Sequence, residues 1–105
     1  MNPFEIFITY ISWGIGGKSR PVLVYSQDSL KIAVYSITTQ YDNKSETIKA
    51  KYFKIEDWEQ SGLSKLSYVD IGTLFRLPIS VIDHKNPIGK LSASDIKRFL
   101  EFLDE

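Results

Sequence analysis

The stretch GIGGKSRPVLVYS, residues 14–26, decides how the first half of the chain is interpreted. Its Gly-Lys-Ser is similar to the end of a phosphate-binding nucleotide loop, which also needs an earlier glycine and a helix that opens at the Lys-Ser. Here the earlier position is Ser12, and Arg20 to Tyr25 is a proline-containing run of β-branched and aromatic residues. Such a run is typical of a strand. We therefore expect a flexible, glycine-rich connection between two strands.

Composition favours one compact domain with a single modest core, because the chain has 105 residues, of which 43% are hydrophobic and 13% aromatic. The 13 basic residues balance 13 acidic ones, so general electrostatic attraction to nucleic acid is not implied. The absence of cysteine excludes disulfides and thiol catalysis and fits a reducing cytoplasm. The apolar stretch Phe4 to Ile11 is too short to span a bilayer, so we expect a soluble, cytoplasmic protein.

Hydrophobic alternation and turn residues predict several short strands and one late helix. The predicted strands are Phe4–Ile11, Arg20–Ser26, Leu30–Thr39, Thr47–Ile55, Ser67–Leu77 and a short one at Val81–Ile82. A helical turn is expected at Glu56–Ser61 and ends at Gly62. Ser92 is the expected N-cap of a terminal amphipathic helix, with Asp95 three positions on. The pattern indicates a mainly β fold, a small bent barrel or sheet covered by the helix.

Four segments, in this order, resemble the MazF/PemK (Kid, CcdB-like) family of toxins from type II toxin–antitoxin systems. "GKSRPVLVYS" is similar to the family's Gly-x-Arg-Pro-hydrophobic signature, and "YSITT" to the strand that follows it. "DWEQSGLSKLSYVDIGTL" resembles the segment that leads to a strand carrying an aspartate, and "IGKLSASDIKRFLEFL" the closing helix.

The resemblance implies a single PemK/MazF-like domain over residues 1–105, with an SH3-like (CcdB/PemK-like) β-barrel and a C-terminal α-helix. It also implies a homodimeric, growth-inhibiting toxin that is neutralised by an acidic antitoxin. Many members cleave single-stranded RNA at short sequences through attack of the 2′-hydroxyl on the neighbouring phosphate, which leaves a cyclic phosphate. This chemistry needs a cation and hydrogen-bond donors at the phosphate and a group that moves protons. It needs no metal or cofactor, and the sequence has no cluster of metal ligands.

Three residues match the catalytic positions that the resemblance implies. Arg20 matches the signature arginine, whose guanidinium holds two phosphate oxygens, although a strand-end arginine can instead pair with a surface acid. Thr38 matches the threonine at the end of the Ile-Thr strand, with exposure at a strand end as the alternative. Asp70 matches an acid that takes a proton or orients the nucleophile, and otherwise caps a turn or pairs with Arg20.

Four further residues are candidates for contacts with RNA. Trp13 either stacks on an unpaired base or folds back over the barrel mouth. Lys18 either attracts phosphate or is simply solvated. Thr39 is the alternative to Thr38 as the hydroxyl at the phosphate. Tyr68 can stack or form a hydrogen bond. The only histidine, His84, precedes an Asn-Pro turn and is expected to be exposed.

The sequence also departs from the family pattern in two places. Many members carry a Pro-x-x-Gly-x-Glu loop between the first two strands, where this chain has the shorter "SWGIGGKS". Some have an arginine two residues before the aspartate, where this chain has Tyr68. The departures favour a second hypothesis, a catalytically weakened SH3-like barrel that only binds a protein or nucleic-acid partner. A third, inhibition of a target such as a topoisomerase, has less support.

Overall fold

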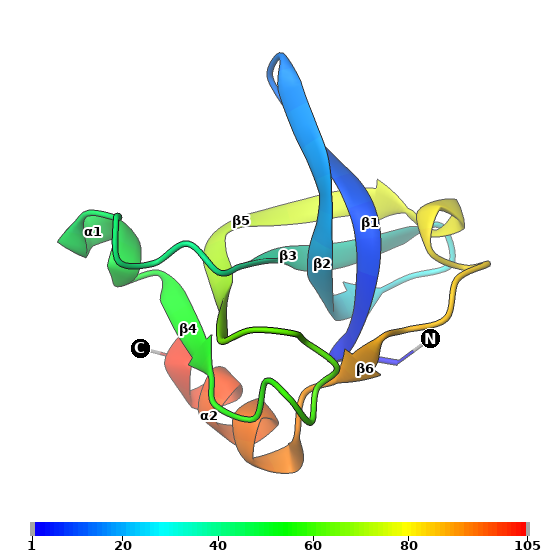
Figure 1. Cartoon of the computed structure of the whole chain (residues 1–105). Helices are drawn as coiled ribbons and strands as arrows, with labels where there is room; N and C mark the ends of the chain where they lie inside the picture. The colour runs from blue at the N-terminus through cyan, green and yellow to red at the C-terminus, as the bar shows by residue number, and fades with distance from the viewer. Residues whose placement is uncertain (1, 105) are drawn as a thin grey trace.

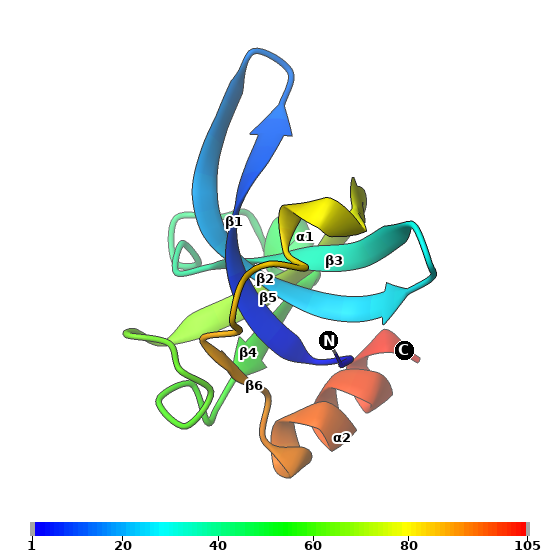
Figure 2. The same ribbon diagram turned by 90° about the vertical axis from the view of Figure 1, so that its right-hand side faces the viewer.

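A computed structural model describes residues 2–104 of the chain. Six antiparallel strands form one sheet in the order β4-β5-β3-β2-β1-β6 (Figure 1). In chain order the elements are β1 (Glu5–Trp13), β2 (Gly16–Gln27), β3 (Lys31–Thr38), α1 (Glu46–Lys49), β4 (Tyr52–Ile55), β5 (Ser67–Pro78), the 3-10 helix Ile79–Val81, β6 (Gly89–Lys90) and α2 (Ala93–Leu103). The sheet is curled, and α2 covers one side of it below β4 (Figure 2).

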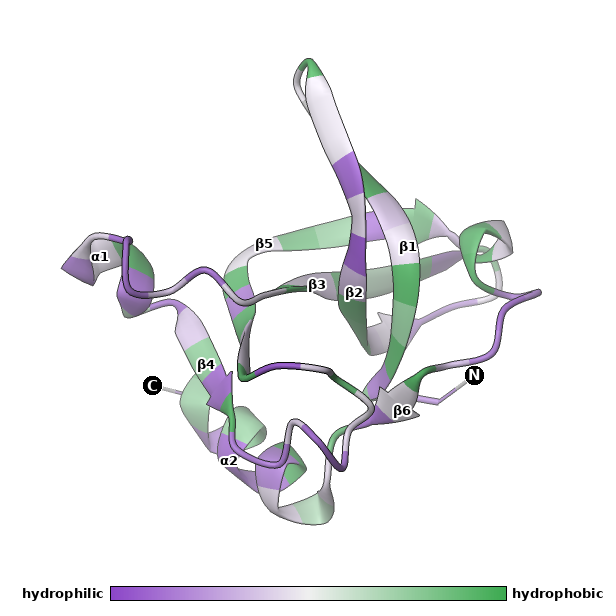
Figure 3. Ribbon diagram, viewed as in Figure 1, coloured by the Kyte–Doolittle hydropathy of each residue, from purple (hydrophilic) through white to green (hydrophobic). Residues whose placement is uncertain are grey.

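The glycine-rich stretch forms a long β-hairpin, and not the flexible connection that we expected. Trp13 pairs with Gly16, so Gly14 and Ile15 alone make the turn. Gly14 has a φ of 48°, a left-handed conformation that suits a two-residue hairpin turn. Gly16, Gly17 and Lys18 belong to β2, which begins four residues earlier than predicted. The hairpin projects from the sheet as an arm, with a hydrophilic stretch of β2 along its lower half and an apolar tip (Figure 3).

Two hydrophobic clusters lie on opposite sides of the central strands. The first contains Leu23, Tyr35 and Val69 and includes Phe99 from α2. The second contains Val22, Val24 and Val34, together with Phe7 and Ile82 from other parts of the chain. Because successive residues of a strand point to opposite sides, β2 and β3 are apolar on both faces where they cross the middle of the sheet.

The predicted strands correspond to β1, β2, β3 and β5, but two predictions were wrong. Residues 46–49 are helical, because the Ser45 hydroxyl accepts the Ile48 N–H and caps a helical turn, so the fourth strand is only Tyr52–Ile55. Ile79–Val81 is a 3-10 helix where a strand was expected at Val81–Ile82.

The terminal helix begins as predicted, since the Ser92 side chain accepts the Asp95 N–H. The expected stop at Gly62 is also observed, because its φ is 89° and its N–H donates to the Glu59 carbonyl. The short β6, which pairs with the start of β1, was not predicted. No helix in residues 2–104 is long and apolar enough to cross a membrane.

Candidate functional site

A groove opens where the arm leaves the sheet. Among the described residues, the β2–β3 ladder has no pair beyond Val22 and Ser36, so β2 and β3 diverge from that point. The opening has a volume of about 220 Å³ and is lined by Lys18, Ser19, Arg20, Pro21, Ile37, Thr38, Thr39, Gln40 and Ser67. It therefore brings together four of the candidate residues, namely Arg20, Thr38, Thr39 and Lys18.

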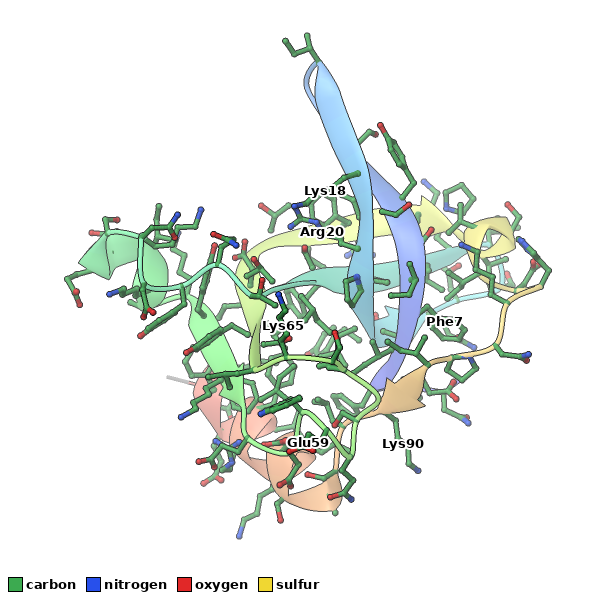
Figure 4. All side chains as sticks on the ribbon, viewed as in Figure 1. Phe7, Lys18, Arg20, Glu59, Lys65 and Lys90 are labelled. Atoms are coloured by element: carbon green, nitrogen blue, oxygen red, sulfur yellow. The ribbon has the colours of Figure 1, made fainter. Side chains whose placement is uncertain are left out.

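Arg20 lines this groove and is held in place by a residue of β3. Its side chain is half-buried, and Nη1 donates a hydrogen bond of 2.9 Å to Oγ of Ser36, which is only 5% exposed. On the other side, Arg20 lies opposite Thr9 of β1. Figure 4 shows the side chains of Lys18 and Arg20 next to each other along the arm, where it rises from the sheet. The guanidinium is thus positioned by a buried hydroxyl, and the exposed Lys18 adds a second positive charge nearby.

A row of polar residues continues from Arg20 across the sheet. Ser36 of β3 lies opposite Asp70 of β5, and Asp70 in turn lies opposite Tyr52 of β4. Residues directly opposite each other on neighbouring strands point to the same side of a sheet. Ser36, Asp70 and Tyr52 therefore lie in one row on one face, and Arg20 joins this row through its hydrogen bond to Ser36. We call these four residues the polar row.

Electrostatics connects the members of the polar row. Burial raises the pKa of the Tyr52 phenol, the negative charge of Asp70 raises that pKa further, and the positive charge of Arg20 lowers it. The phenol of Tyr52 thus lies within electrostatic reach of both the candidate cation and the candidate acid.

Asp70 also has a structural role. Its Oδ1 accepts the N–H of Gly72 at 2.8 Å, beside a bulge in which the β3–β5 register shifts between Tyr35 and Ser36. The turn-capping alternative for Asp70 is therefore observed. Because one carboxylate oxygen is engaged by the bulge, the orientation of the carboxyl group within the polar row is set by the backbone.

Thr38 and Thr39 both border the groove, at the end of β3. The Thr38 hydroxyl is half-buried and accepts the N–H of Gln40 at 3.0 Å. An oxygen that accepts this bond still has a hydrogen to donate, so Thr38 can cap the turn and bind a ligand at once. Thr39 is exposed.

Tyr68 lies opposite Thr38, but its ring belongs to an aromatic cluster. It stacks on Tyr41 of the β3–α1 loop at 4.2 Å between centroids and 4° between planes, and Tyr52 lies 6.4 Å away. Nζ of Lys49 lies 5.0 Å from the centre of the Tyr41 ring. Burial, followed by Tyr41 and Asp42, raises the pKa of Tyr68. One face of the Tyr68 ring is therefore covered by another tyrosine.

Trp13 stands apart from the groove. Its backbone pairs with Gly16 near the tip of the arm, four ladder pairs from Thr9 and Arg20, or roughly 13 Å along the strand. Its side chain lies outside the described part of the structure. Trp13 is thus separated from the other candidates by the length of the arm.

A second hollow lies at the Asp70–Tyr52 end of the polar row. It has a volume of about 280 Å³ and is lined by Lys44, Thr47, Ile48, Lys51, Tyr52, Asp70, Gly72 and Thr73. Tyr52 and Asp70 therefore border a surface that also carries two lysines. The first groove thus includes Arg20 at one end of the polar row, and this hollow includes Asp70 and Tyr52 at the other end.

Three contributors to the site were missed by the sequence analysis: Ser36, Tyr41 and Tyr52. Ser36 had a weak signal, because it precedes Thr38 by two residues in a strand and so shares its face. Tyr52 and Tyr41 had none, since their neighbours belong to other elements. In residues 2–104 no group of three or more His, Cys, Asp and Glu is placed to hold a metal ion.

The arrangement suits an anionic ligand. A fixed guanidinium, an exposed lysine and threonine hydroxyls border an open groove, and groups of these kinds are suited to phosphate oxygens. A carboxylate and a phenol follow Ser36 along the polar row and are groups that can accept and donate protons.

The fold defines a class of small barrel-like proteins in which a curled antiparallel sheet is covered by a C-terminal helix. The toxin MazF-mt6 of Mycobacterium tuberculosis has this fold: the two structures superpose with a TM-score of 0.71 and 22% identity, over 94% of this chain and 91% of that one. No protein-family model and no curated protein sequence matches the chain. The likeness confirms the fold that the resemblance to MazF/PemK toxins implied.

Proposed function

We propose that this protein is the toxin of a type II toxin–antitoxin system and a metal-independent endoribonuclease that cleaves single-stranded RNA. The observation that carries the proposal is the groove lined by both Thr38 and Arg20, whose guanidinium donates a hydrogen bond to Ser36. The fold likeness to a MazF toxin supports it.

In the proposed reaction the groove binds the scissile phosphate of the RNA. Arg20 neutralises the charge that builds on the phosphate oxygens as the 2′-hydroxyl attacks, and Thr38 donates a hydrogen bond to one of them. Asp70 accepts the proton of the 2′-hydroxyl, and the products are a cyclic phosphate and a free 5′-hydroxyl. Lys18 and Thr39 bind the flanking RNA backbone.

The proposed protein acts in the cytoplasm as a homodimer, and an acidic antitoxin neutralises it. The basic side of the groove, with Arg20 and Lys18, is a surface on which an acidic segment can lie and fold as it binds. An antitoxin bound there would block the groove to RNA.

The alternative is a barrel that binds a partner without cleaving RNA. Two observations favour it: the connection between β1 and β2 is a two-residue turn, and the Tyr68 ring is stacked on Tyr41. Induced expression distinguishes the two, because only a nuclease produces new, sequence-specific 5′ ends in total RNA as growth stops.

The catalytic role of Arg20 is tested with purified protein and a long single-stranded RNA. We expect Arg20→Ala to lower the cleavage rate by about a hundredfold to a thousandfold, the range for loss of a transition-state donor. The matched control is Arg76→Ala, which removes an exposed arginine on the part of β5 that pairs with Ala33. A chelator should leave the wild-type rate unchanged.

The cleavage rates are compared only if both variants unfold at temperatures close to that of the wild type, since a loss of folding would also lower the rate. Equal rates for Arg20→Ala and wild type would remove Arg20 from the mechanism. Sensitivity to the chelator would contradict metal-independent cleavage. Absence of cleavage by the wild type would leave the binding module as the better account.

A further inference from the structure

Cleavage by a 2′-hydroxyl involves two proton transfers, and the lining of the groove offers Arg20, Thr38 and the exposed Lys18 for the second. One proton leaves the 2′-oxygen and one must reach the 5′-oxygen as its bond to phosphorus breaks. A guanidinium stays protonated and a threonine hydroxyl is a weak acid, so neither Arg20 nor Thr38 is a suited donor. His84 follows the end of β5 that pairs with Lys31, whereas Asp70 lies near the opposite end of the strand.

Besides the lysines of the groove and the hollow, the phenols on β4 and β5 are candidates for this proton, and the structure separates their surroundings. Tyr52 lies directly opposite Asp70 and lines the same hollow as that residue. Tyr68 lies opposite Thr38 and has one ring face covered by Tyr41. The charges that act on the Tyr52 phenol are those of Asp70 and Arg20, whereas Tyr41 and Asp42 act on Tyr68.

The polar row spans the sheet from β2 to β4. Neighbouring strands lie about 4.8 Å apart, so Tyr52 is one strand spacing from Asp70, and Asp70 is one spacing from Ser36 and two from the strand that carries Arg20. Ser36 in turn accepts a hydrogen bond from Arg20. The cation, the acid and the phenol thus follow one another along the polar row.

This inference rests on the proposed RNA cleavage: we propose that Tyr52 is the general acid that protonates the leaving 5′-oxygen, in partnership with Asp70 as the base. As the 2′-oxygen forms its bond to phosphorus, its proton passes to the free carboxylate oxygen of Asp70. As the bond from phosphorus to the 5′-oxygen breaks, the phenolic proton of Tyr52 passes to that oxygen. The Asp70 proton then returns to the Tyr52 phenolate, across the strand pair, and both groups regain their starting forms.

Electrostatics acts on the Tyr52 phenol in two directions. Burial and the charge of Asp70 raise the pKa of Tyr52, so the phenol retains its proton at neutral pH but is a weaker acid than a free phenol. The positive charge of Arg20 acts in the opposite direction and stabilises the phenolate that forms during the reaction.

The test compares two versions of one short RNA, which differ only at the linkage that wild-type protein cleaves. One has the natural 5′-oxygen, and the other has a 5′-sulfur, whose thiolate leaves without a proton. We expect Tyr52→Phe to cleave the oxygen substrate about a hundredfold more slowly than wild type, the lower end of the range for general acid catalysis. On the sulfur substrate its rate should stay within about threefold of the wild-type rate.

Two controls accompany this comparison. Tyr25→Phe removes a phenol hydroxyl on the side of β2 that packs against Tyr35 and should cleave both substrates as wild type does. Asp70→Asn should be slowed on both substrates, because the proton of the 2′-hydroxyl must be removed in each case. Since Tyr52→Phe keeps the ring that packs against Tyr41 and Tyr68, its fold is expected to be retained.

The outcomes separate this inference from the proposed function. Two results with an active wild type would show that Tyr52 is not the acid: Tyr52→Phe cleaves the oxygen substrate as fast as wild type, or it is slowed equally on both substrates. In either case the proposed RNA cleavage still stands. If wild type cleaves neither substrate, the proposed function fails, and the role of Tyr52 fails with it.

Discussion

Single residues in this protein act through the neighbours that orient them. The buried Ser36 accepts an N–H group of Arg20, which limits the positions that this long, flexible side chain can take. Asp70 is oriented in the same way by the Gly72 N–H. A hydrogen bond to a strand or bulge thus positions each charged group of the polar row.

Glycine is required at Gly62 for two separate reasons. Its φ of 89° is a conformation that other residues rarely adopt, and a Cβ atom there would collide with the carbonyl oxygen of Ile88. A Cβ at Gly89 would similarly meet the carbonyl of Ser61. The two backbone segments therefore approach each other as closely as they do only because both positions are glycine.

We expect Gly62→Ala to lower the free energy of unfolding by about 3 kcal/mol or more, the sum of backbone strain and overpacking. Gly14→Ala is the matched control, because Gly14 also has a positive φ but has open space around the added methyl group. It should cost only about 1–2 kcal/mol. Urea unfolding of the two variants measures both values, and equal losses would mean that the contact with Ile88 is unimportant.

At the scale of elements, α2 is joined to the rest of the fold by a buried carboxylate. Asp95 is fully buried and accepts the N–H groups of Glu56 and Asp57 from the segment that follows β4, and it also forms an ion pair with Arg98. Ser92 donates a hydrogen bond to Asp57. The start of the helix thus caps a neighbouring loop as well as itself.

The turn between β2 and β3 also depends on a carboxylate. Oδ1 of Asp28 accepts the N–H groups of Leu30 and Lys31, each at 2.8 Å. These two hydrogen bonds are the main cause of a lowered Asp28 pKa. A lowered folded-state pKa means that the stabilisation is complete above the ordinary value of 3.8 and is lost as the pH falls through the lower, folded-state value.

We therefore expect Asp28→Ala to unfold a few degrees below wild type near neutral pH, with a difference that shrinks once the pH falls well below 3.8. Ser29→Ala, which alters the same turn but keeps the carboxylate, is the control. Thermal unfolding monitored by circular dichroism over a pH series measures the effect. A difference that stayed constant down to the most acid conditions would show that the charge of Asp28 does not stabilise the turn.

At the scale of the whole molecule, the arm leaves backbone and apolar side chains at the surface. Among the described residues, β1 pairs with β6 only through Glu5 and Ile6, so the rest of that edge has no strand partner. Ile8 is 40% exposed and Tyr10 is 59% exposed on one face of the same strand. An open edge with apolar residues is a surface that a second copy of the chain can cover.

We expect a homodimer in solution, with twice the chain mass of 12.1 kDa by light scattering at micromolar concentration. Tyr10→Lys should shift the equilibrium towards the monomer, because it places a charge on the exposed face of the arm. Leu30→Lys, at an exposed apolar position in the β2–β3 turn, is the control and should leave the mass unchanged. A wild-type monomer would contradict the proposed dimer.

The sequence alone determined the elements whose signals are local. The apolar runs of β2, β3 and β5, the capping hydroxyl of Ser92 and the turn glycine Gly62 each depend on residues adjacent in the chain. The hydrophobic alternation of residues 47–49 wrongly predicted a strand, because the Ser45 side chain caps a helical turn there. Arg20 and Thr38 were matched to catalytic positions only through the resemblance to a family.

Tertiary structure decided which residues share the site. The polar row depends on the register of four strands, and a shift of one residue would turn Asp70 away from Ser36 and Tyr52. The contact of Tyr41 with Tyr68 likewise joins a loop to a strand that begins well after it in the chain. Such relations arise from pairing between distant segments, so the spacing of residues along the chain does not contain them.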